Sequence, residues 1–394
     1  MKAIKFGLLP RIITAIIFGI LLGTITPDWI TRTCLTFNSI FSQFLNFLIP
    51  LIILGFVAPA IADIGKSAGR MLITTAILAY GFTILAGGLS YIAGSGLFPS
   101  IIEKTAELSV AESSDGLKPY FNVEIPSIMP VMTALVSAFT FGLGIAYLKS
   151  DILKRGFDEF RDIVSMVIRR VIIPLLPFYI FGIFLNMTSA GQVWPILNTF
   201  ARIILIIFVL HVFILLLQFC IAGLCTRRNP LRLLWTMMPA YFTALGTQSS
   251  AATIPVTLRQ TISMGVTEET AGFVVPLCAT IHMSGSTLKI VACALALMIM
   301  QGHPYDAGMF MGFISMLAVT IIAAPGVPGG AIMASLGLLS SMLGFTEADN
   351  AMMIALYIAM DSFGTACNVT GDGSIALIVG RIFRRKPAAT AVQA

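Results

Sequence analysis

Four polar side chains near the C-terminus share one face of an otherwise apolar helical segment. Asp361, Thr365, Asn368 and Asp372 fall within an arc of about 60° when each residue turns the helix by roughly 100°. At 1.5 Å per residue, the stripe is about 16 Å long. Carboxylates and carboxamides at membrane depth are costly unless paired, coordinated or hydrated, so the stripe predicts a pathway for a small polar solute with an ion beneath it. The alternative is a buried ion pair or a hydrogen-bonded clamp between helices.

The composition is that of a protein embedded in a membrane. Of the 394 residues, 57% are hydrophobic and 11% are charged, and the mean hydropathy is +0.95. These values exclude an ordinary soluble domain. The net charge of +6 comes from short basic clusters between apolar segments, as the positive-inside rule requires, so we exclude a nucleic-acid partner. The six cysteines form no CxxC motif and are expected to be small buried hydrophobes rather than disulfides or zinc ligands.

Apolar segments of membrane-spanning length recur along the chain. They predict helices at about 5–26, 36–63, 70–96, 127–149, 163–187 and 196–225. Because such segments recur and no small-residue cleavage motif follows the first, that segment is predicted to be a membrane helix rather than a cleaved signal. The basic loops can all be placed on the cytoplasmic side together with both termini.

Two further apolar segments, at about 231–260 and 306–345, are each broken in the middle by small and polar residues. Non-helical backbone at membrane depth requires protein or a water-filled cavity around it. We therefore predict two re-entrant helical hairpins that enter from opposite sides. Paired interruptions of this kind point to a transporter site, where half-helix N-termini offer N–H groups to an anion. For either segment alone, a packing kink is the alternative.

Four motifs in the C-terminal part carry a family resemblance. They read TQSSAATIPVT at 247–257, PLCATIHMSGST at 276–287, GVPGGAI at 326–332 and NVTGD at 368–372. In this order they resemble the hairpin 1, unwound seventh-helix, hairpin 2 and eighth-helix motifs of the dicarboxylate/amino acid:cation symporter family, the glutamate-transporter homologues. The stretch from Asp361 to Asn368 also resembles the sodium/serine-threonine branch of that family.

The resemblance implies an all-α fold with eight transmembrane helices and two re-entrant hairpins in a multi-pass protein of the cell (inner) membrane. It implies a homotrimer in the lipid bilayer with a scaffold part at about 5–63 and 127–187. It also implies a transport part at about 70–96 and 196–385, which moves like an elevator with hairpin 2 as its gate.

The resemblance also implies a substrate site. Its residues are Ser249, Ser250, Gly326, Val327, Gly329, Asp361, Gly364, Thr365 and Asn368. In the family, the position of Asp361 binds an α-ammonium, and the position of Asn368 binds the α-carboxylate with the hairpin-tip amides. Gly364 stands where members that take acidic substrates commonly have arginine, and the sequence shows no obvious replacement for that cation. We therefore predict a small neutral amino acid such as serine, threonine or alanine; the alternative is a dicarboxylate or an acidic amino acid.

A cation site is implied by the same motifs. Its residues are Cys278, Thr280, His282, Asn368 and Asp372, which would supply hard oxygen ligands, mostly backbone carbonyls, to co-transported Na⁺. His282-Met283-Ser284 stands where the family usually has Asn-Met-Asp, so one carboxylate is missing and we predict one or two Na⁺ per cycle. Because the unperturbed pKa of histidine is about 6.5, His282 makes H⁺ the alternative coupled cation.

Two other classes of protein are less consistent with the pattern. A channel needs a continuous polar path, whereas two gated hairpins favour alternating access. An intramembrane enzyme is disfavoured because Asp361 and Asp372 lie about 16 Å apart along the helix, and the chain has no HExxH or GxSxG motif. The chain is predicted not to be an enzyme.

Overall fold

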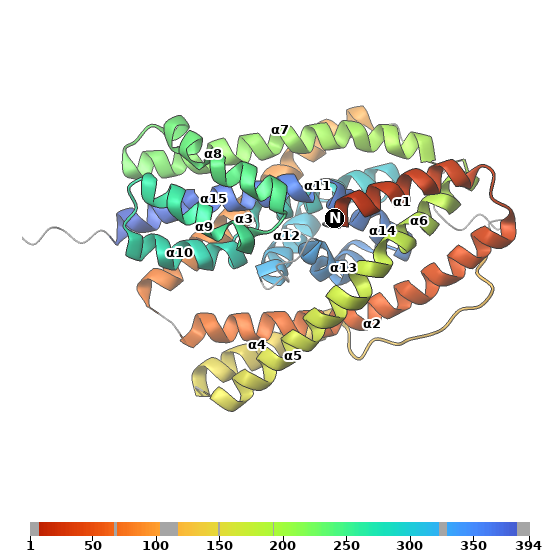
Figure 1. Cartoon of the computed structure of the whole chain (residues 1–394), viewed down its shortest axis with the longest axis horizontal. Helices are drawn as coiled ribbons and strands as arrows, with labels where there is room; N and C mark the ends of the chain where they lie inside the picture. The colour runs from red at the N-terminus through yellow and green to blue at the C-terminus, as the bar shows by residue number, and fades with distance from the viewer. Residues whose placement is uncertain are drawn as a thin grey trace, which may run out of the picture.

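The first group of helices gathers around one long helix in the N-terminal half. The computed structural model describes residues 8–66, 69–102, 117–148, 150–191, 193–322 and 329–383. Within them, α2 (Asp28–Lys66) packs against α4 (Val131–Leu148), α5 (Asp151–Val167) and α6 (Ile173–Ser189), and α1 (Leu8–Gly23) packs against α6. A short π-helical turn, η1 (Ile168–Ile172), makes α5 and α6 one continuous stretch. Figure 1 shows α2, α4 and α5 together along the lower side of the molecule.

Small residues allow these helices to approach closely. A Cβ atom added at Gly23 of α1 would lie 2.8 Å from the carbonyl oxygen of Leu185 in α6. A Cβ atom at Gly142 of α4 would lie 2.8 Å from the carbonyl oxygen of Ala58 in α2. Glycine at helix contacts is typical of membrane proteins, where close van der Waals packing replaces the hydrophobic driving force.

The second group of helices surrounds α15 (Asp361–Ile382), the helix that carries the polar stripe. Its neighbours are α7 (Val193–Thr226), α8 (Pro230–Thr247), α9 (Ser250–Ser263), α10 (Glu268–Ile281) and α11 (Ser284–Met300). On another side, α3 (Arg70–Ile101) runs along α11. In Figure 1, α7, α8 and α15 lie on the side opposite α2 and α4. The stripe is therefore enclosed by protein on several sides.

The helix over 268–300 is interrupted where the sequence predicts an unwound motif. α10 ends at Ile281 and α11 begins at Ser284, with His282 and Met283 in non-helical conformations between them. The stretch is long and apolar enough to cross a membrane, and α11 is buried along its whole length. Helix termini leave N–H and C=O groups without intrahelical partners, so this break exposes backbone polar groups beside α15.

A helical hairpin occurs at the place of the first predicted re-entrant hairpin. α8 and α9 pack against each other and are joined at Gln248 and Ser249. Gln248 has a left-handed backbone with φ of +54°, and the side chain of Ser249 accepts a hydrogen bond from the amide N–H of Ala252 at 3.3 Å. The left-handed residue ends α8 and the serine cap begins α9, which makes the reversal tight.

The second predicted hairpin corresponds to α12 (Ala307–Ile322) and α13 (Gly330–Leu343), which pack against each other. Its predicted tip residues Gly326 and Val327 lie outside the described residues. The described part of the tip is Gly329, whose φ of +78° is a left-handed conformation that favours glycine.

The predicted helix count is supported only in part. Six helical stretches of the described chain are long and apolar enough to cross a membrane, or seven if α14 (Glu347–Ala359) and α15 form one span bent by 63°. Within the described residues, α1 covers 8–23 of the predicted segment 5–26, and α2 begins at Asp28 rather than near 36, because Asp28 supplies an acidic first turn.

The cysteines are free among the described residues, but not all are buried as the sequence predicts. Cys278, Cys293 and Cys367 are buried, whereas Cys220 and Cys225 are exposed on α7. α7 is a strongly apolar, membrane-length helix, so lipid can provide the apolar surroundings that protein provides elsewhere.

Polar contacts connect the two groups of helices at the start of α14. The side chain of Glu347 accepts hydrogen bonds from Gln43 and Asn46 of α2, at 3.5 and 3.4 Å. The hydroxyl of Tyr179 in α6 donates to the backbone oxygen of Glu347 at 3.3 Å. The start of α14 is therefore tied to the first group, whereas α15 belongs to the second.

Candidate functional site

The predicted polar stripe lies on α15 and is buried. Asp361, Thr365, Asn368 and Asp372 are between 1% and 7% exposed. Each of the two carboxylates has a nitrogen partner from α11 or from the break that precedes it. The stripe therefore contains two separate polar centres, one at each end, joined by Asn368.

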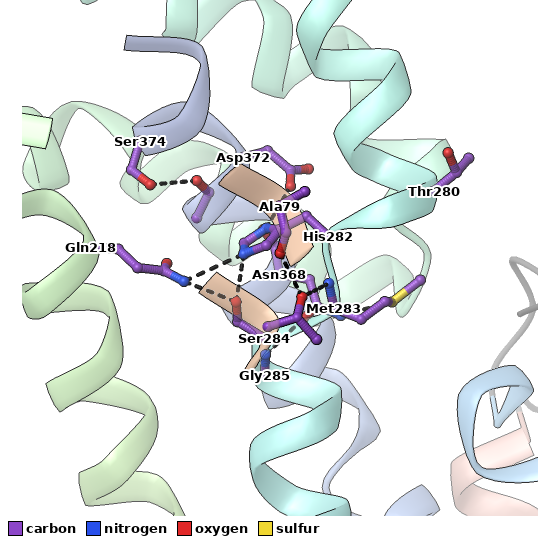
Figure 2. Close-up of polar contacts among 12 residues, drawn as sticks. Ala79, Gln218, Thr280, His282, Met283, Ser284, Gly285, Asn368, Asp372 and Ser374 are labelled. Atoms are coloured by element: carbon purple, nitrogen blue, oxygen red, sulfur yellow. Dashed lines mark hydrogen bonds and ion pairs between the residues drawn. The ribbon is translucent and has the colours of Figure 1, made fainter. Parts of the chain in front are cut away.

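The centre near Asp372 is built around His282 (Figure 2). The Nδ1 atom of His282 lies 2.9 Å from Asp372 Oδ1 and 3.2 Å from the backbone oxygen of Asn368. Its Nε2 atom lies 2.5 Å from Ser284 Oγ, and Gln218 Nε2 of α7 donates to the same hydroxyl oxygen at 2.9 Å. A consistent assignment has Nδ1–H donating to the carboxylate and the Ser284 hydroxyl donating to Nε2.

Aspartate, histidine and serine in this order have the atoms of a hydrolytic triad, but the serine is not available to a substrate. Ser284 is 0% exposed and His282 is 1% exposed. The Ser284 hydroxyl is held between two buried side chains, the imidazole and the amide of Gln218. The arrangement therefore fixes the imidazole against Asp372 rather than exposing a nucleophile.

Asn368 links the stripe to the first turn of α11. Its Oδ1 atom accepts hydrogen bonds from the N–H groups of Gly285 and Ser286, at 2.8 and 3.3 Å. Its Nδ2 group donates to Ser286 Oγ at 3.0 Å. The carboxamide thus caps the helix N-terminus next to the break, where a helix can hold an anion or an acceptor oxygen.

The centre near Asp361 contains a lysine that the sequence analysis did not single out. Lys289 of α11 is 0% exposed, and its Nζ atom lies 2.9 Å from Asp361 Oδ1. The ammonium also approaches the backbone oxygens of Tyr357 and Met360, at 3.4 and 3.5 Å, and lies 3.4 Å from the centre of the Tyr357 ring. The other carboxylate oxygen, Oδ2, accepts a hydrogen bond from the N–H of Gly329 at 2.9 Å.

Lys289 occupies the space beside Gly364. A Cβ atom added at Gly364 would lie 2.8 Å from Nζ and 2.9 Å from Cε of the lysine. The inference that no cation replaces the arginine expected at this position is therefore wrong, because Lys289 places one there from the neighbouring helix. The sequence does carry a signal for it, since a lysine in an apolar segment marks a functional position by its desolvation cost.

The remaining predicted site residues lie at different places in the structure. Ser249 caps α9, Ser250 begins that helix, and the neighbouring Gln248 donates to Ser362 Oγ of α15 at 2.9 Å. The carbonyl of Cys278 accepts the N–H of His282 at 2.9 Å. Thr280 is exposed, donates to the backbone oxygen of Leu277, and lies apart from the Asp372 centre in Figure 2.

Two of the predicted cation ligands, the Asp372 carboxylate and the Asn368 carbonyl, both contact the Nδ1 atom of His282. No group of three or more histidine, cysteine, aspartate or glutamate side chains that could hold a metal ion occurs within the described ranges. Asp372 is the carboxylate at this centre, and the carbonyl of Asn368 lies beside it. A monovalent cation bound by backbone oxygens and one carboxylate fits this donor set better than a divalent metal.

Removal of the Ser284 hydroxyl is expected to destabilise the protein measurably. The Ser284→Ala variant removes the hydroxyl that Gln218 and His282 share in a buried site and leaves only their contact of 3.3 Å with each other, which costs about 1 to 3 kcal/mol. Thermal unfolding of the purified protein in detergent measures the loss. Thr280→Val is the matched control, because its exposed hydroxyl bonds only within its own helix. Equal decreases in the unfolding temperature of the two variants would contradict the stabilising role of the Ser284 hydroxyl.

Comparisons with known proteins agree with the motifs. The pattern that describes the sodium:dicarboxylate symporter family matches residues 8–382. The chain is 27% identical over 387 residues to proteins named serine/threonine transporter SstT from Acinetobacter baumannii strains AYE and AB307-0294, and the similarity covers 93% of this chain and 95% of each relative.

Proposed function

We propose that this chain, which belongs to the sodium:dicarboxylate symporter family, couples uptake of a small neutral amino acid to the inward movement of a monovalent cation. The family and its relatives are transporters, not enzymes, and the apolar helices make the chain an integral multi-pass membrane protein. The relatives named as serine/threonine transporters support a substrate of that size and charge.

The observation that carries the proposal is the buried carboxylate of Asp361. It lies at the start of α15 and already holds an ammonium group at 2.9 Å and a hairpin-tip N–H at 2.9 Å. The α-ammonium of an amino acid is a chemically equivalent ligand for the same carboxylate. Lys289 and the Tyr357 ring fill the space beside Gly364, which favours a substrate with a short side chain.

Sodium is the proposed cation, and a proton is the second candidate. The family name and the Asp372 carboxylate with the nearby backbone oxygen of Asn368 support sodium. The contact between His282 Nδ1 and Asp372 Oδ1 favours the second candidate, because this imidazole can carry a proton at the place proposed for the ion.

The proposal includes the homotrimer and the elevator movement. The separation of α1, α2 and α4–α6 from the helices around α15 supports a static part and a moving part with the predicted boundaries. The site on α15 would then move with its surrounding helices, and both termini would lie in the cytoplasm.

A second candidate substrate is a dicarboxylate or an acidic amino acid. The ammonium of Lys289 beside Gly364 favours it, because a second carboxylate in a dehydrated site needs a cationic partner. The two candidates differ in whether the substrate amine or an additional carboxylate is recognised.

Counterflow in liposomes tests the substrate and the cation together. The purified protein is expected to exchange serine, threonine and alanine, and to neglect succinate and aspartate. Net uptake is expected to stop when choline replaces sodium and to continue when the proton gradient is collapsed. Uptake of succinate or aspartate with no response to serine contradicts the proposed substrate, and the reverse ion dependence assigns the coupling to protons.

Removal of the Asp361 charge is expected to reduce serine uptake by about 10- to 100-fold, since a hydrogen bond between charged groups contributes about 1.5 to 3 kcal/mol. The variant is Asp361→Asn, assayed in liposomes at limiting serine. Asp306→Asn is the control, because Asp306 is exposed and only caps the start of α12. Unchanged uptake by Asp361→Asn would rule out recognition of the amine by this carboxylate.

A further inference from the structure

Lys289 is a basic side chain enclosed in the core of an integral membrane protein. Its side chain is 0% exposed, and its ammonium has the Asp361 carboxylate, two backbone oxygens and an aromatic ring as partners. A buried ammonium is strongly disfavoured unless its charge is balanced, so the pair with Asp361 is required for the lysine to remain charged there.

The surrounding residues fit the lysine closely. Gly364 has no side chain, and any Cβ atom there would contact the last two carbons and the nitrogen of Lys289. The Tyr357 ring lies against the ammonium, and its hydroxyl donates to Ser286 Oγ at 3.1 Å. The site is therefore built to hold the ammonium of Lys289 beside Asp361.

The net charge of the buried site follows from its ionisable side chains. Among the described residues, the buried aspartates and lysine are Asp349, Asp361, Asp372 and Lys289. Asp349 belongs to the capping box at the start of α14 and also binds Gln301, away from the stripe. Lys289 cancels the charge of Asp361, so a single negative charge, that of Asp372, remains when the buried His211 and His282 are neutral.

Charge balance then limits how many ions can accompany the substrate. A zwitterionic amino acid adds no net charge to the site. One monovalent cation at Asp372 neutralises the loaded site, whereas a second one would leave an uncompensated positive charge in a region of low dielectric. The same count holds whether the cation is sodium or a proton.

We propose that Lys289 is a resident counter-ion that takes the place of a second co-transported cation, so that the carrier moves one cation with each neutral amino acid. The proposal rests on the cation-coupled symport proposed above. It assigns to Lys289 the role of setting the coupling ratio, and it explains why the position beside it is a glycine.

The coupling ratio can be measured as the membrane potential at which net serine flux stops. The full chain is reconstituted in liposomes with equal sodium concentration and pH on both sides and a tenfold serine gradient. One charge moved per serine requires about 60 mV to balance that gradient, and two charges require about 30 mV. The wild-type protein is expected to give about 60 mV.

Removal of the lysine charge is expected to add a cation to the cycle. The Lys289→Met variant leaves Asp361 uncompensated, so its zero-flux potential is expected to fall to about 30 mV. Lys289→Arg keeps the charge, and the double variant Lys289→Met with Asp361→Asn removes both charges, so both are expected to remain near 60 mV. A wild-type value near 30 mV, or no change in Lys289→Met, overturns the proposal.

A binding measurement covers the case in which Lys289→Met folds but does not transport. Thermal stabilisation of the purified protein is followed against the concentration of the coupled cation, and its slope on a logarithmic scale reports the number of ions bound to the folded state. The slope is expected to double in Lys289→Met, and an unchanged slope overturns the proposal.

The counterflow experiment can identify a charged solute instead of serine. In that case the zero-flux potential is measured with that solute, and the charge of the solute is subtracted from the charge moved per cycle. An error in the proposed substrate is thereby separated from an error in the coupling ratio.

Discussion

Replacement of Asp372 by alanine is expected to lower cation-coupled uptake by at least about 100-fold. The carboxylate is 1% exposed, and His282 Nδ1 is its partner at 2.9 Å. Removal of one member of a buried pair costs about 3 to 5 kcal/mol, and 1.4 kcal/mol already corresponds to a tenfold change. The variant also loses the negative charge that balances the proposed cation. Initial uptake rates in liposomes under an imposed sodium or proton gradient measure the effect.

A matched control separates loss of the site from loss of a buried carboxylate in general. Asp349 is 4% exposed and accepts hydrogen bonds from Thr346 at the start of α14 and from the Gln301 side chain. Asp349→Asn is expected to keep uptake within about threefold of the wild type, because loss of a helix cap costs about 1 kcal/mol. Wild-type uptake by Asp372→Ala, with correct size-exclusion behaviour, would show that this carboxylate has no part in coupling.

Replacement of Gly285 by alanine is expected to disrupt the contact between α11 and α15. The added Cβ atom would lie 2.5 Å from the carbonyl oxygen of Gly364 and 2.7 Å from Cys367 Cβ. A backbone carbonyl within a helix cannot move aside, so the helices must separate, and overpacking of this kind costs about 1 to 3 kcal/mol. Separation also breaks the hydrogen bond from the Gly285 N–H to Asn368 Oδ1. We expect a lower unfolding temperature in detergent and loss of uptake.

The control for this substitution is Gly88→Ala in α3. A Cβ atom at Gly88 has no other atom within 4 Å, so alanine there is expected to be neutral or stabilising by up to about 1 kcal/mol, as in an open helical position. If Gly285→Ala unfolds at the wild-type temperature, the close approach of α11 and α15 does not limit the size of the side chain at position 285.

Helical periodicity and turn chemistry predicted the local features of the site. The common face of Asp361, Thr365, Asn368 and Asp372 follows from their spacing, and all four lie buried on α15. The reversal at Gln248 was predicted because small and polar residues interrupt an apolar run there, whereas the break at His282 was predicted from the resemblance of 276–287 to an unwound family motif. Such features depend on neighbours in the sequence, which is why they could be derived from it.

The partners of the two carboxylates could not be derived in the same way. Lys289 and Asp361 are 72 residues apart, and His282 and Asp372 are 90 residues apart. Periodicity shows which residues share a face of a helix, but not which other helix lies against that face. The pairing depends on how closely α11 approaches α15, which glycines at 285 and 364 permit. An apolar segment that contains one lysine indicates a buried partner without identifying it.

The hydrogen bonds of Asp361 have a kinetic consequence. One carboxylate oxygen is bound to Lys289 and the other to the Gly329 N–H at the described edge of the second hairpin tip. A solute that binds this carboxylate replaces contacts that the carboxylate already makes. The net affinity of the solute is therefore the difference between the free energy of the new contacts and the similar free energy of the contacts that are lost. Modest affinity of this origin accompanies fast dissociation, since differences in affinity appear mainly in the dissociation rate. A carrier must release its solute in every cycle, and a carboxylate with partners of its own favours rapid turnover over tight retention.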